Sequence, residues 1–295
     1  MIIGKNRLEV IKNIKSSAEC HDFYAKVEID DPVLTSEQSD EIIKNYLKNR
    51  VTRSFKIKSC LARFMANILT FALNRKTEIV SIEKLSKMKG GAIITSNHFS
   101  PIENTAIRHL VKKLDKRRIN IVSQVTNLAM TGAIGFLMNY GDTVPISENF
   151  RYMQRDFTNI LAELVEKDEY VLIYPEKEMW FNYRKPREFK RGAYYYAARL
   201  NVPVISCFVE IQDLPEKDKG DFNKVKYTVH ILDVLYPDSN KTVKENSIEM
   251  CQRDYQLKKE VYEKVYGKPL VYTFEKDDIA GWTGNLNSLI LKGKN

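Results

Sequence analysis

The chain has 295 residues, of which 43% are hydrophobic and 29% charged, and its formal net charge is +9. This composition is that of a globular protein with a substantial core, and it excludes a largely disordered chain. The basic excess favours polyanionic partners, namely nucleic acid, anionic lipid headgroups or phosphorylated substrates, without choosing among them.

Two sequence patterns limit where the protein acts. No run reaches the ~18 apolar residues that a membrane-spanning helix needs, so we expect any membrane contact to be peripheral. The start, MIIGKNRLEVIKNIK, carries charges every few residues, and we expect no secretory signal there. The four cysteines (Cys20, Cys60, Cys207 and Cys251) are widely spaced, which predicts free thiols in a reducing cytosol and no zinc site.

Residues 1–56 are predicted to form an extension with one capped helix. Asp-Asp-Pro at 30–32 interrupts the chain, and a helix starts near Thr35 or Ser36 and continues through EIIKNYLKNR.

Residues 57–74 predict a second helix with a wide apolar face. The apolar residues at helical spacing are Ile57, Leu61, Phe64, Met65, Ile68 and Ala72, and Leu69, Phe71 and Leu73 widen the stripe. The flanking basic residues are Lys56, Lys58, Arg63 and Arg75. Such a helix either lies in a membrane interface with its basic residues on headgroups, or packs on the core of its own domain. The pattern leaves both interpretations open.

From residue 78 to about residue 235, apolar strands alternate with amphipathic helices. The predicted strands are GAIITS, INIVSQ, YVLIYP, VPVISCFVEI and KVKYTVHILDVLY, and the helices are ENTAIRHLVKKL, FTNILAELVEK and RGAYYYAARL. This alternation indicates an α/β fold with a mostly parallel central sheet flanked by helices. A last helix is predicted from Thr242 to Tyr266.

The segment SNHFSPIEN, residues 96–104, carries the first candidate chemistry. His98 directly follows an apolar strand, where reactive groups gather in parallel sheets. Ser100, Pro101 and Glu103 fit the N-cap, first and third positions of the next helix, and the turn between His98 and Glu103 lets their side chains meet. An imidazole oriented by a carboxylate is a general base for a hydroxyl group. In the alternative interpretation, Glu103 only caps the helix and His98 is an ordinary hydrogen-bonded histidine at a strand end.

A second segment, YPEKEMW at 174–180, follows the strand YVLI and precedes a basic run. Five basic residues fall within residues 184–191, namely Arg184, Lys185, Arg187, Lys190 and Arg191. Such side chains can hold a phosphate, and arginine does so with two hydrogen bonds. The alternative is a solvated basic loop. Glu176 and Glu178 beside it disfavour a simple nucleic-acid-binding surface.

These two segments, in this order, resemble the glycerolipid acyltransferase family, whose best-known members are the lysophosphatidic acid acyltransferases. The family's Asn-His-x4-Asp motif is matched by Asn97, His98 and, at the Asp position, Glu103. Its Phe-Pro-Glu-Gly-Thr-Arg motif is matched by Tyr-Pro-Glu at 174–176, after which Lys-Glu-Met at 177–179 departs from it.

Three further stretches support the resemblance. GDTVPIS at 141–147 resembles the family's middle block, with Ser147 at the usual Arg position. KRGA at 190–193 is similar to its Lys-Lys-Gly-Ala helix start, and VPVIS at 202–206 to its Val-Pro-x-x-Pro, with serine replacing the final proline. The resemblance covers roughly residues 78–235.

The resemblance implies a division of the chain into three parts. Residues 1–76 would be an N-terminal helical extension and candidate membrane-docking element. Residues 77–237 would be the catalytic domain, and residues 238–295 a C-terminal helical tail that packs on it.

The activity implied is transfer of a fatty acyl group from acyl-CoA or acyl carrier protein to the hydroxyl of a lysophospholipid such as 1-acyl-glycerol-3-phosphate. His98 would be the general base and Glu103 its partner. The expected substrate-binding residues are Asn97, Glu176, Arg184, Lys185 and Arg187. The expectation is no cofactor or metal, a peripheral position on the cytoplasmic face of the cell membrane, and an anionic membrane surface as a partner.

Three alternatives to this activity stay in view. Glu103 and Ser147 depart from the family pattern, which suits a catalytically weak or inactive protein that binds an anionic lipid on the same fold. Ser147 and Met179 stand where the family has Arg, which suits a different lysolipid or a glycolipid as the acceptor. Nucleic-acid binding lacks a motif with the right spacing. A serine hydrolase lacks a Gly-x-Ser-x-Gly elbow, and neither a Walker loop nor a HExxH zinc motif is present.

Overall fold

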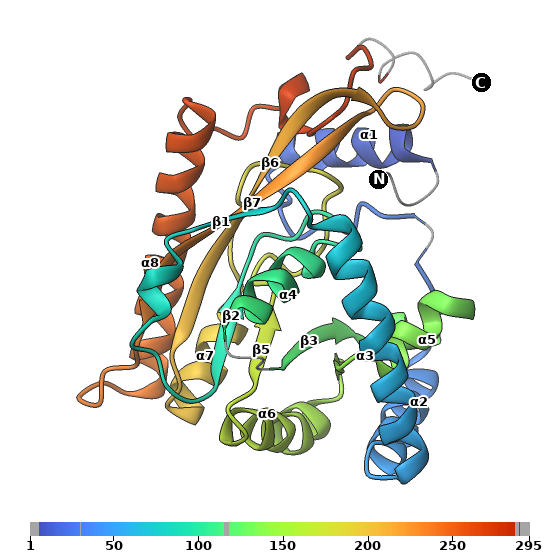
Figure 1. The fold of residues 1–295 in the computed structure, drawn as a ribbon, viewed down its shortest axis with the longest axis vertical. Coiled ribbons are helices and arrows are strands. Elements are labelled where there is room, and N and C mark those ends of the chain that lie inside the picture. The colour runs from blue at the N-terminus through green and yellow to red at the C-terminus, as the bar shows by residue number, and fades with distance from the viewer. Residues whose placement is uncertain (1–5, 30, 115–117, 287–288, 290–295) are drawn as a thin grey trace.

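A seven-stranded sheet runs through the middle of the molecule (Figure 1). The structure, a computed structural model, describes residues 6–29, 31–114, 118–286 and 289. The strand order is β1-β7-β6-β2-β5-β3-β4, and neighbours run parallel except for the antiparallel pair β6 and β7. The predicted mostly parallel α/β fold is therefore confirmed.

The strands are β1 (Glu78–Val80), β2 (Ala92–Thr95), β3 (Ile119–Gln124), β4 (Thr143–Ile146), β5 (Tyr170–Ile173), β6 (Val204–Lys217) and β7 (Asn223–Leu235). The α-helices are α1 (Arg7–Glu19), α2 (Ser36–Asn49), α3 (Arg53–Leu73), α4 (Asn104–Lys113), α5 (Gly132–Tyr140), α6 (Thr158–Glu166), α7 (Gly192–Leu200) and α8 (Val243–Tyr266). Shorter helical turns are η1 (Ile82–Leu85), η2 (Val125–Ala129), the π-helical η3 (Tyr152–Phe157) and η4 (Lys276–Asp278).

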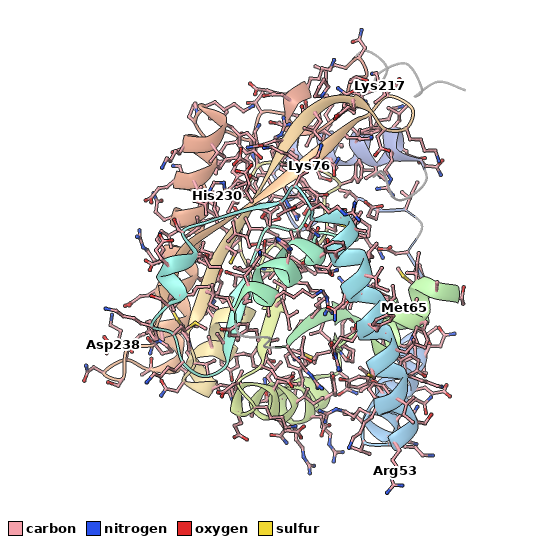
Figure 2. All side chains as sticks on the ribbon, in the orientation of Figure 1. Arg53, Met65, Lys76, Lys217, His230 and Asp238 are labelled. Atoms are coloured by element: carbon pink, nitrogen blue, oxygen red, sulfur yellow. The ribbon has the colours of Figure 1, made fainter. Side chains whose placement is uncertain are left out.

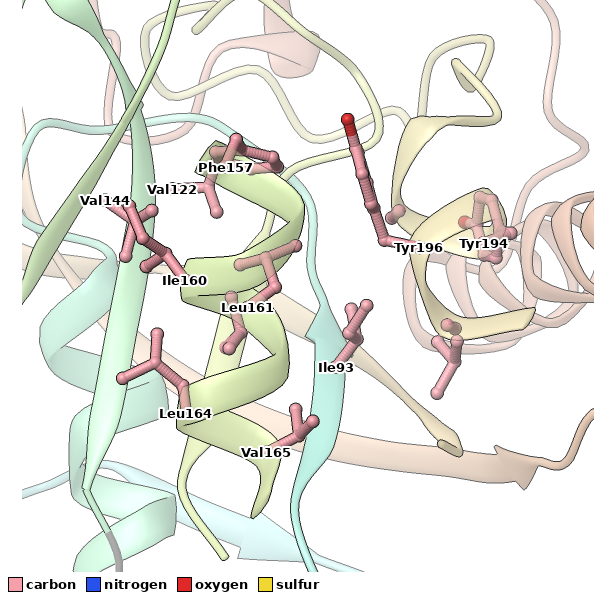
Figure 3. Close-up of a cluster of buried hydrophobic side chains, with 14 of the residues drawn as sticks. Ile93, Val122, Val144, Phe157, Ile160, Leu161, Leu164, Val165, Tyr194 and Tyr196 are labelled. Carbon is pink, nitrogen blue, oxygen red and sulfur yellow. The ribbon is translucent and has the colours of Figure 1, made fainter. Parts of the chain in front are cut away.

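Alternation along the strands divides the interior into two cores, one on each face of the sheet. Ile93 of β2 and Val171 of β5 point to one face, and Ile94 and Leu172, the next residues, point to the other. Helices α6, α7 and α8 cover the first face, and Figure 3 shows α6 packed against this side of the sheet. Helix α4 covers the second face. The result is three layers with the ends of the strands left free to carry a site.

A buried polar cluster ties α8 to the strand that precedes His98. Asp254 of α8 accepts hydrogen bonds from Thr95 Oγ1 at 2.7 Å and from Lys258 Nζ at 2.7 Å, and it also contacts Ser206 and Tyr194. Asp254 and Lys258 are fully buried, so each compensates the other's charge.

The predicted extension divides between two parts of the molecule. Helices α2 and α3 lie near α5, whereas α1 lies at the other end (Figure 1). There Val10, Ile11 and Ile14 of α1 pack in a third core with Trp180 and with residues of the C-terminal segment. The sequence patterns did not predict α1, although its apolar residues at i, i+1 and i+4 give the signal of a helical face. Helix α5 and strand β4 were not predicted either.

Among the described residues, no helix combines the length and apolarity needed to cross a bilayer.

Candidate active site

His98 and Glu103 form a hydrogen-bonded pair at the carboxyl end of β2. Nδ1 of His98 lies 2.5 Å from Oε1 of Glu103. The Glu103 side chain is 2% exposed and that of His98 is 21% exposed. Because a carboxylate only accepts hydrogen bonds, Nδ1 carries the hydrogen, and in the neutral imidazole the lone pair is therefore on Nε2. The pair therefore has the geometry of an oriented general base.

The same glutamate also holds the backbone that leads from His98 into the next helix. Its Oε2 accepts hydrogen bonds from the backbone N–H groups of Phe99, at 2.8 Å, and Ser100. Helix α4 begins at Asn104 rather than at Pro101, because residues 101–103 form a turn. One oxygen of the carboxylate thus contacts His98 and the other holds the backbone of Phe99 and Ser100, so the side chain does more than the capping alone that the alternative interpretation assumed.

Tyr174, at the end of β5, stacks on the imidazole. The ring centroids of His98 and Tyr174 are 4.1 Å apart and the planes differ by 7°. Burial, followed by the nearby Glu103 carboxylate, raises the pKa of Tyr174 well above its ordinary value, so its hydroxyl is neutral. The sequence motifs predicted no role for this residue, although β2 and β5 are parallel neighbours whose carboxyl ends must adjoin.

Glu176 and Arg187 form a buried ion pair beneath this loop. Glu176 Oε2 lies 2.8 Å from Arg187 Nη2, with the two side chains 2% and 0% exposed. The same oxygen accepts a hydrogen bond from the backbone N–H of His98 at 3.2 Å, and Arg187 Nη1 donates to Phe23 O at 2.9 Å. The pair therefore holds the backbone of His98 and of the segment after α1.

Both ends of the Asn97 side-chain amide form hydrogen bonds with the backbone of β6. Its Oδ1 accepts from Val209 N at 2.8 Å, and its Nδ2 donates to Val209 O at 3.0 Å. The side chain is buried, and the contact fixes the chain just before His98.

Arg184 and Lys185 lie in the interior and are already paired. Arg184 Nη2 lies 2.5 Å from Asp213 Oδ1, and Lys185 Nζ lies 2.7 Å from Asp278 Oδ2 in a fully buried pair. The sequence had predicted that Arg184, Lys185 and Arg187 bind the substrate. The structure does not bring them together as an open phosphate-binding surface. The physical reason is that buried cations need anionic partners, and each of the three has its own within the protein.

Within the described part of the chain, one group of carboxylates has the spacing of a metal site. Glu275, Asp277 and Asp278 lie together in the C-terminal segment. Lys268 Nζ lies 2.7 Å from Glu275 and 2.8 Å from Asp277, and Lys185 binds Asp278, so cations of the protein itself neutralise this group.

Comparison with known proteins gives a family match over part of the chain. Residues 71–210 match the model of the acyltransferase family, a segment that begins in α3 and ends within β6. A similar solved structure is that of the 1-acyl-sn-glycerophosphate (LPA) acyltransferase PlsC from Thermotoga maritima, with 12% sequence identity, a TM-score of 0.49, and coverage of 89% of this chain and 98% of that chain. Residues 71–210 are therefore similar to the acyltransferase family, which agrees with the resemblance that the sequence motifs indicate.

Proposed function

We propose that this protein is an acyltransferase that moves a fatty acyl group from acyl-CoA or acyl carrier protein to the hydroxyl of a lysophospholipid such as 1-acyl-glycerol-3-phosphate. The observation that carries the assignment is the 2.5 Å contact between His98 Nδ1 and Glu103 Oε1, inside the matched family segment. It leaves an imidazole nitrogen free for proton transfer at the end of a strand.

The chemistry needs one base and no electron transfer. Nε2 of His98 accepts the proton of the acceptor hydroxyl as its oxygen attacks the carbonyl carbon of the thioester. The tetrahedral intermediate then collapses, the carbon–sulfur bond breaks, and the thiolate takes the proton back from the imidazolium. The products are an ester and a free thiol. Glu103 stabilises the imidazolium while it exists.

The residues expected to bind substrate take a positioning role in this mechanism. Glu176 and Arg187 support the backbone of His98, and Asn97 anchors it to β6. Tyr174 limits rotation of the imidazole by stacking on it. Arg184 and Lys185 connect the following loop to the C-terminal segment through Asp277 O and Asp278.

We further propose that α3 docks the enzyme on an anionic membrane surface. Five large apolar side chains with exposed fractions between 54% and 71% form one stripe along it, namely Ile57, Leu61, Phe64, Ile68 and Phe71. Exposed basic residues flank the stripe, namely Arg53, Lys56, Lys58 and Arg75. Figure 2 shows Arg53 and Met65 along this helix, at one side of the molecule. An exposed apolar stripe with basic flanks suits a helix that lies in the headgroup region.

The test is thiol release from a donor, measured with and without an acceptor. Purified protein receives acyl-CoA or acylated carrier protein together with a set of lysolipids that differ in headgroup. We expect release that depends on a lysolipid and equals the ester formed. Lysolipid binding without release from either donor would instead support the inactive lipid-binding protein that Glu103 and Ser147 suggested.

A further inference from the structure

A basic cavity lies between α3, α4 and the start of β3, on residues that have no part in the proposed chemistry. Its volume is about 220 Å³, and its polar lining consists of Arg63, Asn67, Arg108, Lys112, Arg118 and Asp142. Arg108 lies five residues after Glu103 on α4, about 7.5 Å further along the helix axis. The cavity is therefore near the reaction site without including it.

Among the residues that the structure describes, the positive charges lining this cavity exceed the negative charge. Arg63 takes both oxygens of Asp142, with Nε and Nη2 each at 2.9 Å from one of them. Arg108, whose side chain is 7% exposed, donates to Gly141 O at 2.7 Å, but its Nη1 lies 3.8 Å from Asp142 Oδ2, beyond hydrogen-bonding distance. One carboxylate thus serves two guanidinium groups.

Of the two remaining cations, Lys112 adds to the excess, whereas Arg118 has a carboxylate beside it. Lys112 Nζ reaches the backbone oxygen of Asn67 at 3.4 Å, and Arg118 faces Glu169 at 3.5 Å. Burial lowers the pKa of Arg108, and burial together with the Arg108 charge lowers the pKa of Lys112. Charges held in a partly buried cavity without enough counter-charge are stabilised by a bound anion.

We propose that this cavity binds a phosphate group. Arginine presents paired N–H donors that match phosphate oxygens, and the lysine adds a third cationic donor. The volume is below the ~300 Å³ at which pockets for whole drug-sized ligands begin, so it fits a headgroup and not an entire lipid or nucleotide.

The position of the cavity indicates where the phosphate comes from. Asn67 lies four residues before Phe71 on α3, about 40° from it around the helix axis, so the cavity adjoins the apolar stripe. A phosphate headgroup of the bilayer on which α3 docks would reach it. This source rests on the proposed docking of α3, whereas the anion site itself does not.

The first experiment measures binding of inorganic phosphate to the full chain by calorimetry at constant ionic strength. Lys112→Gln/Arg118→Gln removes two exposed cations of the cavity, and Lys87→Gln/Lys113→Gln removes two exposed lysines outside its lining. We expect saturable binding by the wild type and the control, and affinity weakened about tenfold or more in the cavity variant, since half of the cationic donors are gone. Arg108→Met should weaken phosphate binding further. If that variant does not fold, the comparison of Lys112→Gln/Arg118→Gln with the control double variant is sufficient to test the proposal. No saturable binding, or equal affinity in the two double variants, would overturn the proposal.

The second experiment separates a lipid headgroup from free phosphate. Vesicles of the phosphate-free neutral lipid digalactosyldiacylglycerol contain either phosphatidic acid or oleic acid at equal surface charge. Acyl transfer is not needed for the readout. If the lipid supplies the phosphate, the wild type prefers phosphatidic acid, saturating inorganic phosphate removes the preference, and the cavity variant lacks it. Equal binding to both vesicles would overturn the lipid source.

Discussion

Glu103 contacts the His98 imidazole as well as the backbone of Phe99 and Ser100. Its contact with the imidazole gives a kinetic prediction. Glu103→Gln should lower kcat by about 10²-fold or more with little change in KM, because the carboxylate acts on an imidazolium that forms only during the reaction. Glu103→Asp keeps the charge and should retain part of the activity. Steady-state kinetics with both variants, beside circular dichroism, make the measurement. A large change in KM at unchanged kcat would contradict the orienting role.

Arg187 offers a test between support of the loop and binding of the acceptor. Arg187→Met leaves the buried Glu176 carboxylate without its cation, and we expect a loss of about 3–5 kcal/mol in the free energy of unfolding. Lys190→Met, an exposed change nearby, is the control. Denaturant unfolding gives both values. Unchanged stability with a KM raised only for phosphorylated acceptors would restore the role that the sequence had suggested.

At the scale of the element, α3 carries the prediction on membranes. Phe64→Ser/Ile68→Ser should weaken cosedimentation with anionic vesicles about tenfold or more, because each apolar side chain contributes roughly 1.5–3 kcal/mol when fully buried. Tyr236→Ser/Val271→Ser removes two exposed apolar side chains elsewhere and should bind as the wild type does. Equal loss in both double variants would place the docking surface outside α3.

Substitutions serve this test better than removal of the N-terminal extension. Helix α1 contributes Val10, Ile11 and Ile14 to the core that surrounds Trp180. Trp180 Nε1 also donates to Ala25 O at 3.0 Å. A deletion of residues 1–75 would therefore disturb the loop of Glu176 and Arg187 together with the docking helix, and the two effects would not separate.

At the scale of the whole molecule, the cysteines report whether the core is closed. Cys20 and Cys60 are exposed, whereas Cys207 and Cys251 are buried. Burial raises the pKa of Cys207 to about 12 and that of Cys251 to about 11, so both stay as unreactive thiols at about pH 8. A disulfide reagent should label two thiols quickly and the other two only at the rate of unfolding. Rapid labelling of all four would contradict the packing of β6 and α8.

The sequence predicted what depends on neighbouring residues and missed what depends on distant ones. The strand before His98 and the capping pattern at Glu103 are local, so the fold class and the paired side chains could be predicted. The basic run at 184–191 could not be interpreted correctly, because Arg184 meets Asp213 and Lys185 meets Asp278, 29 and 93 residues away. Whether a basic residue is solvated or buried is decided by such partners, which no local pattern contains.

The central claim is that His98 is the base for acyl transfer, and His98→Ala tests it most directly. Thiol release from the acyl donor, with a saturating lysolipid acceptor, is compared between the wild type and the variant, with the melting temperature of each as a check on folding. We predict a fall of about 10²–10⁴-fold or to background, at an unchanged melting temperature. Acceptor-dependent release that persists at the wild-type rate in the folded variant would contradict the claim.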